Sequence, residues 1–390
     1  MLPRGVRLSI GGYNDKLAKF ASYVTQKVRD IIPSDENEFE RFKDENARGL
    51  AAFDVKQPYA HCSYYASLAT QPTIFQYSNK ELRDATMDAR LEDLSSYVET
   101  LWSSGKAVAL VQGNLDENEA ISLVKKIEKS LNFQPISEDE YPKELSPLPL
   151  PPIAAKATPT RIVISEPNPS NSNSAVYVII QDLSEEAKDH VMMELISSIL
   201  LEPFYQDLRT QQQLGYIVSS GIKANGKTRY LGFVVQSSIA STDKLTLETL
   251  KFLDKARSNI LEKLGEADLA VYVRSLIDRK TEPDKVLSQE VTRNWAEIGS
   301  GRLQFDRVQV EAAALLDVTK EDLLAFWDKL YVNDGRRVLI TESVPRTGVA
   351  SSTPPPLSTG YASGRIGNKD LVIGVDDIER FRQDREASAA

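Results

Sequence analysis

Cysteine and histidine are almost absent from this chain of 390 residues, which limits the disulfides and metal sites that it can form. The single cysteine, Cys62, excludes an internal disulfide and favours a reducing compartment. The two histidines, His61 and His190, lie far apart in the sequence. A catalytic zinc ion commonly needs about three protein ligands, often two of them histidines. We therefore expect no metal or other cofactor to be bound by this chain.

Excess positive charge and long apolar runs are missing as well. The formal net charge is −9 and the pI is about 5.1, and no block of lysine and arginine gathers locally. Nucleic acid and anionic membranes are therefore not expected as partners. No apolar run reaches the roughly 18 residues of a membrane span, and the first residues lead into no signal-peptide core. We expect a cytoplasmic protein.

Hydrophobic residues make up 41% of the chain, which is enough for sizeable cores, and the length predicts two or three domains. Residues 134–160 hold seven prolines and predict an extended linker, because proline fixes φ and has no N–H to donate. Residues 346–370 are rich in Ser, Thr, Pro and Gly. The sequence therefore predicts a mobile tail over 346–390, with a short terminal helix that begins near Val375.

Strand and helix patterns alternate along the rest of the chain. Period-two and apolar runs predict strands at 6–10, 107–112, 161–165, 175–181, 216–222, 230–236 and 337–341. Helical spacing predicts helices at 16–32, 35–52, 57–69, 89–103, 115–131, 185–201, 243–263, 266–279, 284–299 and 320–331. The economical arrangement is an α+β fold, a mainly antiparallel sheet with helices on one face.

The sequence also repeats itself. Three short patterns recur in the same order and with nearly the same offset: Asp15-Lys16-Leu17 as Asp243-Lys244-Leu245, Glu92-Asp93-Leu94 as Glu321-Asp322-Leu323, and Val108-Ala109-Leu110 as Val338-Leu339-Ile340. We infer two related units, 1–133 and 161–345. The first has no counterpart of 161–229 and is incomplete. An incomplete sheet leaves an unpaired edge, so we expect residues 1–130 to be poorly stable alone.

The most informative motif is DLRTQQQLGYIV, from Asp207 to Val218. It predicts a polar helix end that leads into a strand and brings a guanidinium, Arg209, close to a phenol, Tyr216. Such groups can hold a carbonyl or a developing oxyanion. Taken alone, the residues also fit a structural role, with a buried Arg209 that tethers the helix end and a half-buried strand Tyr216. Gly215 fits a close backbone approach or a plain bulge.

The motif and several other stretches resemble the insulinase/pitrilysin family of zinc metallopeptidases. The stretches are Arg209-Thr210 with Gln213-Leu214-Gly215-Tyr216, Gly12-Tyr13-Asn14-Asp15-Lys16, Gln57-Pro58 with His61 and Tyr64-Tyr65, and Trp295-Ala296-Glu297-Ile298 with Phe305-Asp306-Arg307. Members of the family have four related α+β units, paired into two halves that close around a chamber. The resemblance places this chain at the end of the third unit and all of the fourth.

In that family, zinc is bound by an inverted His-x-x-Glu-His motif in the other half. This chain has no such motif, because His190 and Glu194 are at the wrong spacing and no second histidine is near. We interpret His61 as a packed or capping residue and His190 as a solvated or packed residue. The resemblance implies that Arg209 and Tyr216 support the transition state of peptide hydrolysis, and that Tyr205 and Gly215 contribute to substrate binding. Zinc is expected in the complementary catalytic half, in the same or a separate chain, with peptides as substrates. A scaffold or binding subunit on the same fold is the alternative.

Overall fold

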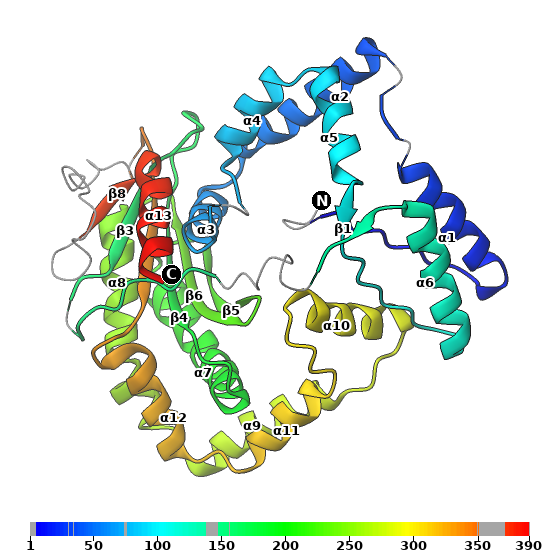
Figure 1. Cartoon of the computed structure of the whole chain (residues 1–390). Coiled ribbons are helices and arrows are strands. Elements are labelled where there is room, and N and C mark those ends of the chain that lie inside the picture. Colours follow the sequence, from blue (N-terminus) through cyan, green and yellow to red (C-terminus); the bar gives the residue numbers. More distant parts are fainter. Residues whose placement is uncertain are drawn as a thin grey trace. The chain divides into compact units, whose positions relative to one another are not determined.

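The computed structural model describes residues 5–29, 31–33, 35–73, 76–137, 147–155, 157–348, 350 and 371–389 (Figure 1). Contacts divide the chain into two compact units. Unit 1 comprises Met1–Ala52, Tyr77–Leu145 and Asp284–Gly301, and unit 2 comprises Phe53–Gln76, Ser146–Pro283 and Arg302–Ala390. This division follows packing, whereas the boundaries at 133 and 161 follow the repeat and stay a prediction. Much of the predicted linker and tail lies outside the described residues.

Unit 2 contains a six-stranded sheet in the order β5-β6-β4-β7-β3-β8. The strands are β3 (Thr160–Ser165), β4 (Ser174–Asp182), β5 (Ile217–Asn225), β6 (Thr228–Ser237), β7 (Val338–Val344) and β8 (Val372–Gly374). The pairs β5–β6, β6–β4 and β4–β7 are antiparallel, while β3 is parallel to both β7 and β8. The α+β fold class and the mainly antiparallel sheet are confirmed.

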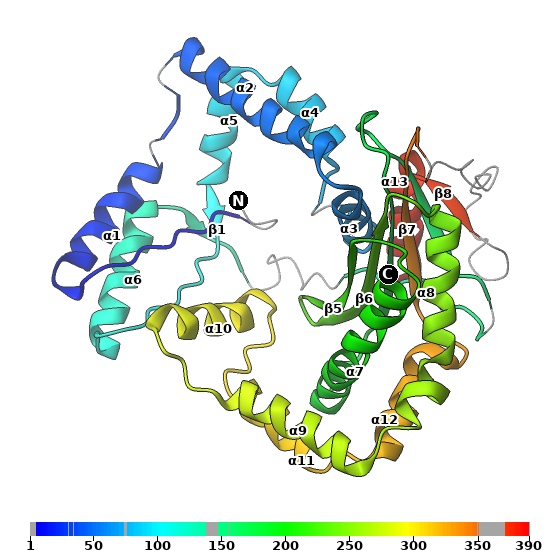
Figure 2. The ribbon, with the colours of Figure 1, turned by 180° about the vertical axis from the view of Figure 1, so that it is seen from behind.

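Central strand β4 is buried on both faces, so its alternate side chains enter two different cores. Val176, Val178 and Ile180 pack with one set of helices, and Tyr177 and Ile179 pack with another. The first set is α7 (Ala187–Tyr205), α8 (Thr242–Ala256), α9 (Glu266–Thr281), α11 (Arg307–Leu316) and α12 (Lys320–Trp327); the second is α3 (Pro58–Ala69) and α13 (Ile378–Ala389) (Figure 2). The prediction that helices cover only one face of the sheet was therefore wrong, because α3 and α13 form a second layer on the other face.

Helix α7 is the central helix of the first layer. Nine of its residues are buried, and its apolar side chains surround the axis instead of forming one stripe, as expected for a core helix. Short π-helical segments continue three of the helices: η2 (Gln206–Gln211) after α7, η3 (Arg257–Leu261) after α8 and η4 (Asp328–Val332) after α12. Two 3₁₀ turns, η1 (Ala52–Val55) and η5 (Val375–Asp377), precede α3 and α13.

Unit 1 is mostly helical. Its elements are α1 (Asn14–Arg29), α2 (Glu36–Ala51), α4 (Asn79–Asp88), α5 (Leu91–Leu101), β1 (Ser104–Gly105), α6 (Glu117–Leu131), β2 (Gln134–Pro135) and α10 (Leu287–Gly299). Strands β1 and β2 form a two-residue parallel pair. The strands predicted at 6–10 and 107–112 are not formed. Pairing explains the difference, since a strand needs a neighbour and this unit has no strand like β4 in its described part.

Two helices, α4 and α11, were not predicted from the sequence. The start of α4 carries a capping box in which Ser78 accepts from the Glu81 N–H and Glu81 accepts from the Ser78 N–H. That Ser-x-x-Glu signal is visible in the sequence. Within the described ranges, no helix is both long and apolar enough to cross a membrane.

Candidate functional site

Arg209 and Tyr216 lie side by side at the end of α7. The Arg209 Nη1 atom donates a hydrogen bond of 2.6 Å to the Tyr216 carbonyl oxygen. Its Cζ atom lies 4.6 Å from the centroid of the Tyr216 ring and 5.0 Å from that of Tyr205. Both distances are in the range of cation–π contacts. The structure therefore brings three of the predicted site residues together around one guanidinium.

Tyr216 is 81% exposed, whereas Arg209 and Tyr205 are half-buried. Tyr216 stands just before β5, which begins at Ile217. A half-buried strand tyrosine, the structural alternative, is therefore not what the fold shows. In the described part of the chain, the Arg209 side chain has no carboxylate partner and the Tyr216 hydroxyl has no hydrogen-bond partner. The pair presents a positive charge and a phenol donor to whatever contacts this surface.

Buried leucines on either side of the motif fix its position. Leu208 is fully buried and Leu214 nearly so, and the Leu214 N–H donates to the Leu208 carbonyl oxygen at 2.9 Å. Between them, Gln213 has a φ of +52°, in the left-handed region that few non-glycine residues adopt. This sharp reversal separates η2, which carries Arg209, from the exposed Tyr216, while both leucines stay in the core.

Gly215 is the position where the backbone requires glycine. A Cβ atom added there would lie 2.0 Å from the carbonyl oxygen of Gln236 on β6. Any side chain would therefore force the start of β5 away from β6 and move the adjacent Tyr216. The predicted close backbone approach is present, although the partner is β6 and a substrate contact stays a prediction.

Two glutamines that the sequence did not single out as site residues support this corner. The Gln236 side chain accepts from the Tyr59 N–H at 3.1 Å and donates to the Gln57 side chain at 3.0 Å. These bonds tie the end of β6, against which Gly215 packs, to the start of α3. Gln57 was visible in the sequence as part of a motif with Pro58, but its partner on β6 was not.

His61 is fully buried, which confirms that it is a packed residue. Its Nδ1 atom lies 3.1 Å from a Glu166 carboxylate oxygen, and its Nε2 atom lies 2.9 Å from the Phe53 carbonyl oxygen. Burial lowers the pKa of the imidazole, but these two hydrogen bonds and the charges of Glu166 and Asp54 outweigh it and leave the pKa raised. Both nitrogens are engaged, so His61 is not available to a metal.

His190 is also packed. Its Nε2 atom donates to the Ser184 carbonyl oxygen at 3.0 Å, and its Nδ1 atom lies 3.5 Å from Glu311. Glu311 is itself buried among cations, with Lys280 at 2.7 Å and Arg229 at 3.0 Å. No group of three or more His, Cys, Asp or Glu side chains in the described part of the chain is arranged to hold a metal ion. The donor set does not fit zinc.

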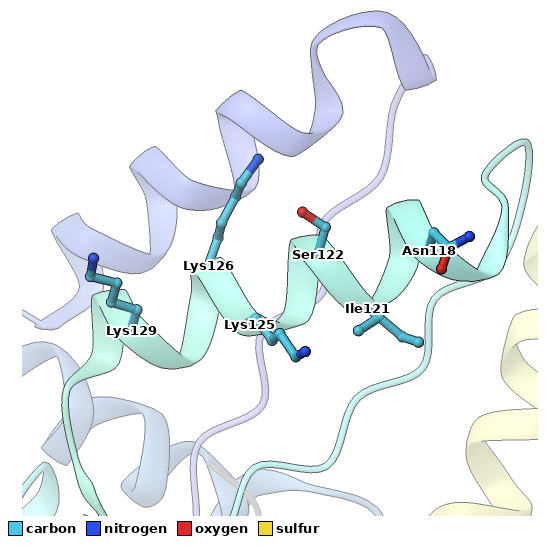
Figure 3. Close-up of a pocket in the computed structure, with 6 residues that line it drawn as sticks. All are labelled: Asn118, Ile121, Ser122, Lys125, Lys126 and Lys129. Carbon is cyan, nitrogen blue, oxygen red and sulfur yellow. The ribbon is translucent and has the colours of Figure 1, made fainter.

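A shallow hollow lies along α6, but it is a poor candidate site. It is open to solvent, has a volume of about 450 Å³ and is lined by Asn118, Ile121, Ser122, Lys125, Lys126 and Lys129. Figure 3 shows Lys125 and Lys126 on opposite sides of the helix, so the ammonium groups do not converge on one point. Lysines that diverge from an exposed helix are ordinary solvated surface.

Two family models match parts of the chain. Residues 2–83 match the middle or third domain of peptidase M16, and residues 195–295 match domain 4 of the C-terminal lobe of PQQ synthase PqqF-like proteins. The second match contains the whole Arg209–Tyr216 motif.

Whole-chain comparisons agree with the family models. Insulin-degrading enzyme from Bos taurus is 30% identical over 335 residues, which cover 85% of this chain and 32% of the relative. The crystal structure of pitrilysin superimposes with a TM-score of 0.74 at 16% identity, covering 95% of this chain and 37% of that chain. A peptidase M16 inactive domain from Pseudomonas fluorescens gives a TM-score of 0.58 at 13% identity, covering 87% of this chain and 78% of that chain.

These matches define the class: the chain has the fold of the pitrilysin-type M16 peptidases. Its homologues are insulin-degrading enzymes and proteins like them, so the resemblance to the insulinase/pitrilysin family is confirmed. The chain spans about a third of the length of the curated relatives that it matches.

Proposed function

We propose that this chain is the C-terminal, non-zinc-binding half of an insulinase-like metalloendopeptidase. In this role it closes the peptide chamber and presents Arg209 and Tyr216 to a peptide held at a zinc site on the complementary half. The observation that carries the proposal is the exposed Tyr216 phenol, held beside a guanidinium that has no carboxylate partner in the described part of the chain. The proposal includes peptide substrates and a cytoplasmic location.

The geometry assigns different tasks to the two side chains. The Tyr216 hydroxyl is free to donate a hydrogen bond to a substrate carbonyl as that oxygen becomes an oxyanion. Arg209 fixes the backbone at Tyr216 through its hydrogen bond and adds positive charge beside the developing oxyanion. Preorganised donors of this kind are worth about 2.7–4 kcal/mol of transition-state stabilisation each. The zinc ion would supply Lewis-acid chemistry from the other half, since the donors among the described residues do not fit it.

A scaffold or binding subunit is the second candidate. It is supported by the donor set, because the described residues offer no group that could hold a metal. The arrangement of Arg209 and Tyr216 favours the first candidate. A scaffold has no use for an exposed phenol placed by a buried turn and by a glycine that no other residue can replace without moving β5.

Reconstitution with an insulinase-type catalytic half that carries His-x-x-Glu-His tests the proposal. Tyr216→Phe removes only the hydroxyl, so we expect kcat to fall about 100-fold or more while KM changes little. Tyr97→Phe, which removes a hydroxyl from a half-exposed ring in unit 1, is the matched control and should leave both constants unchanged. Equal turnover of the Tyr216→Phe complex and the wild-type complex would refute the oxyanion role. Chelator-sensitive cleavage by the pure chain would refute the division of labour.

A further inference from the structure

The start of α3 is capped by a residue of β6. Gln57, at the N-cap position, makes no side-chain capping bond, and Pro58 has no N–H. The next donor is the N–H of Tyr59, which donates to the side-chain oxygen of Gln236 at 3.1 Å. The side-chain nitrogen of Gln236 donates to the Gln57 side chain at 3.0 Å. The first turn of a helix needs such partners, so β6 supplies an acceptor that the sequence of α3 lacks.

Helix α3 is also held along its length and at its other end, and all of these contacts lie within unit 2. In the middle, the Thr341 hydroxyl of β7 donates to the Cys62 carbonyl oxygen at 2.9 Å. Beyond the last turn, the buried Arg382 of α13 donates to the carbonyl oxygens of Gln71 and Pro72 at 2.8 and 2.7 Å. Because β6, β7 and α13 all hold α3, its first turn is a fixed point against which a neighbouring strand is positioned.

The main chain of Gln236 lies against the candidate site. Its carbonyl oxygen would be 2.0 Å from a Cβ atom on Gly215, and Ile217 is its partner in the β5–β6 ladder. Tyr216 stands between these two residues, so its backbone follows the main chain of β6 at this point. Arg209 holds the same backbone by donating to the Tyr216 carbonyl oxygen at 2.6 Å. Gln236 therefore contacts the start of α3 with its side chain and the Tyr216 segment with its main chain.

We propose that Gln236 is a positioning residue for the Tyr216 phenol, which it holds in place by joining β6 to the first turn of α3. The inference rests on the proposed function, because that function gives the phenol its task. Gln236 is buried, so it acts through Tyr216 and not on a substrate. Without its side chain, the Tyr59 N–H loses its acceptor and the start of β5 gains freedom. The phenol is then aligned with a substrate carbonyl for a smaller fraction of the time.

Hydrogen exchange of the full chain tests the positioning without a catalytic half. Gln236→Met keeps a similar size but removes both side-chain hydrogen bonds, so the protected amides among residues 217–219 should exchange at least about tenfold faster. Gln181→Met is the matched control, because Gln181 is a buried glutamine of β4 whose side chain makes three hydrogen bonds to other residues. It should leave exchange at 217–219 unchanged. Unchanged exchange in Gln236→Met, or equal acceleration in both variants, would overturn the proposal.

Gln236→Glu tests the role of the hydrogen bonds by rescue. One carboxylate oxygen can accept from the Tyr59 N–H, and the Gln57 amide, turned about its last bond, can donate to the other. The positive end of α3 stabilises the added charge. Exchange at 217–219 should therefore stay within about twofold of wild type. Exchange as fast as in Gln236→Met would mean that these hydrogen bonds do not position β5, and the proposal would be wrong.

Kinetics of the complex reconstituted with a catalytic half connect the position of the phenol to turnover. Gln236→Met should lower kcat about tenfold with little change in KM, and Gln181→Met should change neither. In a Tyr216→Phe background, Gln236→Met should have little further effect, because Gln236 acts through the phenol. Unchanged kcat in Gln236→Met, or a full tenfold loss in the Tyr216→Phe background, would overturn the positioning role. Equal turnover of Tyr216→Phe and wild type would instead refute the proposed function, and the exchange measurement would still decide whether Gln236 fixes the segment that carries Tyr216.

Discussion

The buried His61–Glu166 pair allows a prediction about stability, because its environment sets both the size of the change in unfolding free energy and the sign of its pH dependence. Both side chains are fully buried, and Glu166 also accepts a 2.7 Å hydrogen bond from the Ser343 hydroxyl. Removing the imidazole leaves this buried carboxyl group without its ion-pair partner. Breaking a buried pair in this way costs about 3–5 kcal/mol. We expect His61→Gln to lower the free energy of unfolding by that amount at pH 6.

The contribution of His61 to the free energy of unfolding should decrease as the pH rises. The pKa of His61 is raised above its ordinary value of 6.5, so the native state holds the proton more tightly than the unfolded state. The contribution is therefore fully present below pH 6.5 and is lost as the pH rises through the folded pKa. The slope approaches about −1.4 kcal/mol per pH unit in that window. The variant lacks this group and should show a flatter profile above pH 6.5.

Urea unfolding monitored by fluorescence measures both effects, since Trp327 is fully buried in unit 2. Wild type, His61→Gln, Glu166→Gln and the double variant form a cycle at pH 6.0 and pH 8.5. The double variant removes the uncompensated charge and should recover part of the loss. Parallel pH profiles for wild type and His61→Gln, or a wild type that gains stability above pH 6.5, would refute the reasoning.

Three further predictions concern other sites. Gly215→Ala places a methyl group against the Gln236 carbonyl oxygen and should cost about 1–3 kcal/mol in urea unfolding, whereas Gly221→Ala, where a Cβ meets nothing, should not; equal costs would contradict the steric argument. Glu311→Gln should lower the free energy of unfolding by about 3–5 kcal/mol near neutral pH. Burial raises the pKa of Glu311, but His190 and the cationic neighbours lower it by more, so the variant should lose less stability than wild type as the pH falls below 4.5. An unchanged stability profile in acid would count against this prediction. Burial raises the pKa of the Cys62 thiol, so a maleimide should modify it at pH 8 only in urea, and rapid native labelling would disagree.

Local patterns in the sequence predicted most of the fold. The alternation of strand residues and the spacing of helix residues are local properties, so β3 to β7 of unit 2 and long helices such as α7 were placed within a few residues, while the short edge strand β8 was not predicted. Pairing is not local. Residues 6–10 alternate like a strand, yet no partner strand completes them in the described part of the chain. The second helix layer was missed for the same reason, because α3 and α13 come from distant parts of the chain.

The candidate site shows the same limit. The spacing of Arg209 and Tyr216 predicted that the two groups would meet, and the structure brings them together. The exposure of Tyr216 could not be predicted, because it depends on the positive φ of Gln213 and on the approach of Gly215 to β6. The Gln57–Gln236 hydrogen bond joins residues that no sequence pattern links. The catalytic role of the pair stays a prediction that the reconstitution experiment tests.

Helix α3 has a consequence for how the protein tolerates deletion. It precedes much of unit 1 in the chain but packs on β4 and β7 of unit 2, where Cys62, Ala66 and Ala69 are buried. Cutting the gene at the proline-rich stretch would therefore not release an intact second repeat. The released fragment would expose Tyr177 and Ile179 and would be prone to aggregation. The two predicted repeats, 1–133 and 161–345, are therefore not independent folding parts, because α3 lies in the first by sequence and packs on the sheet of the second.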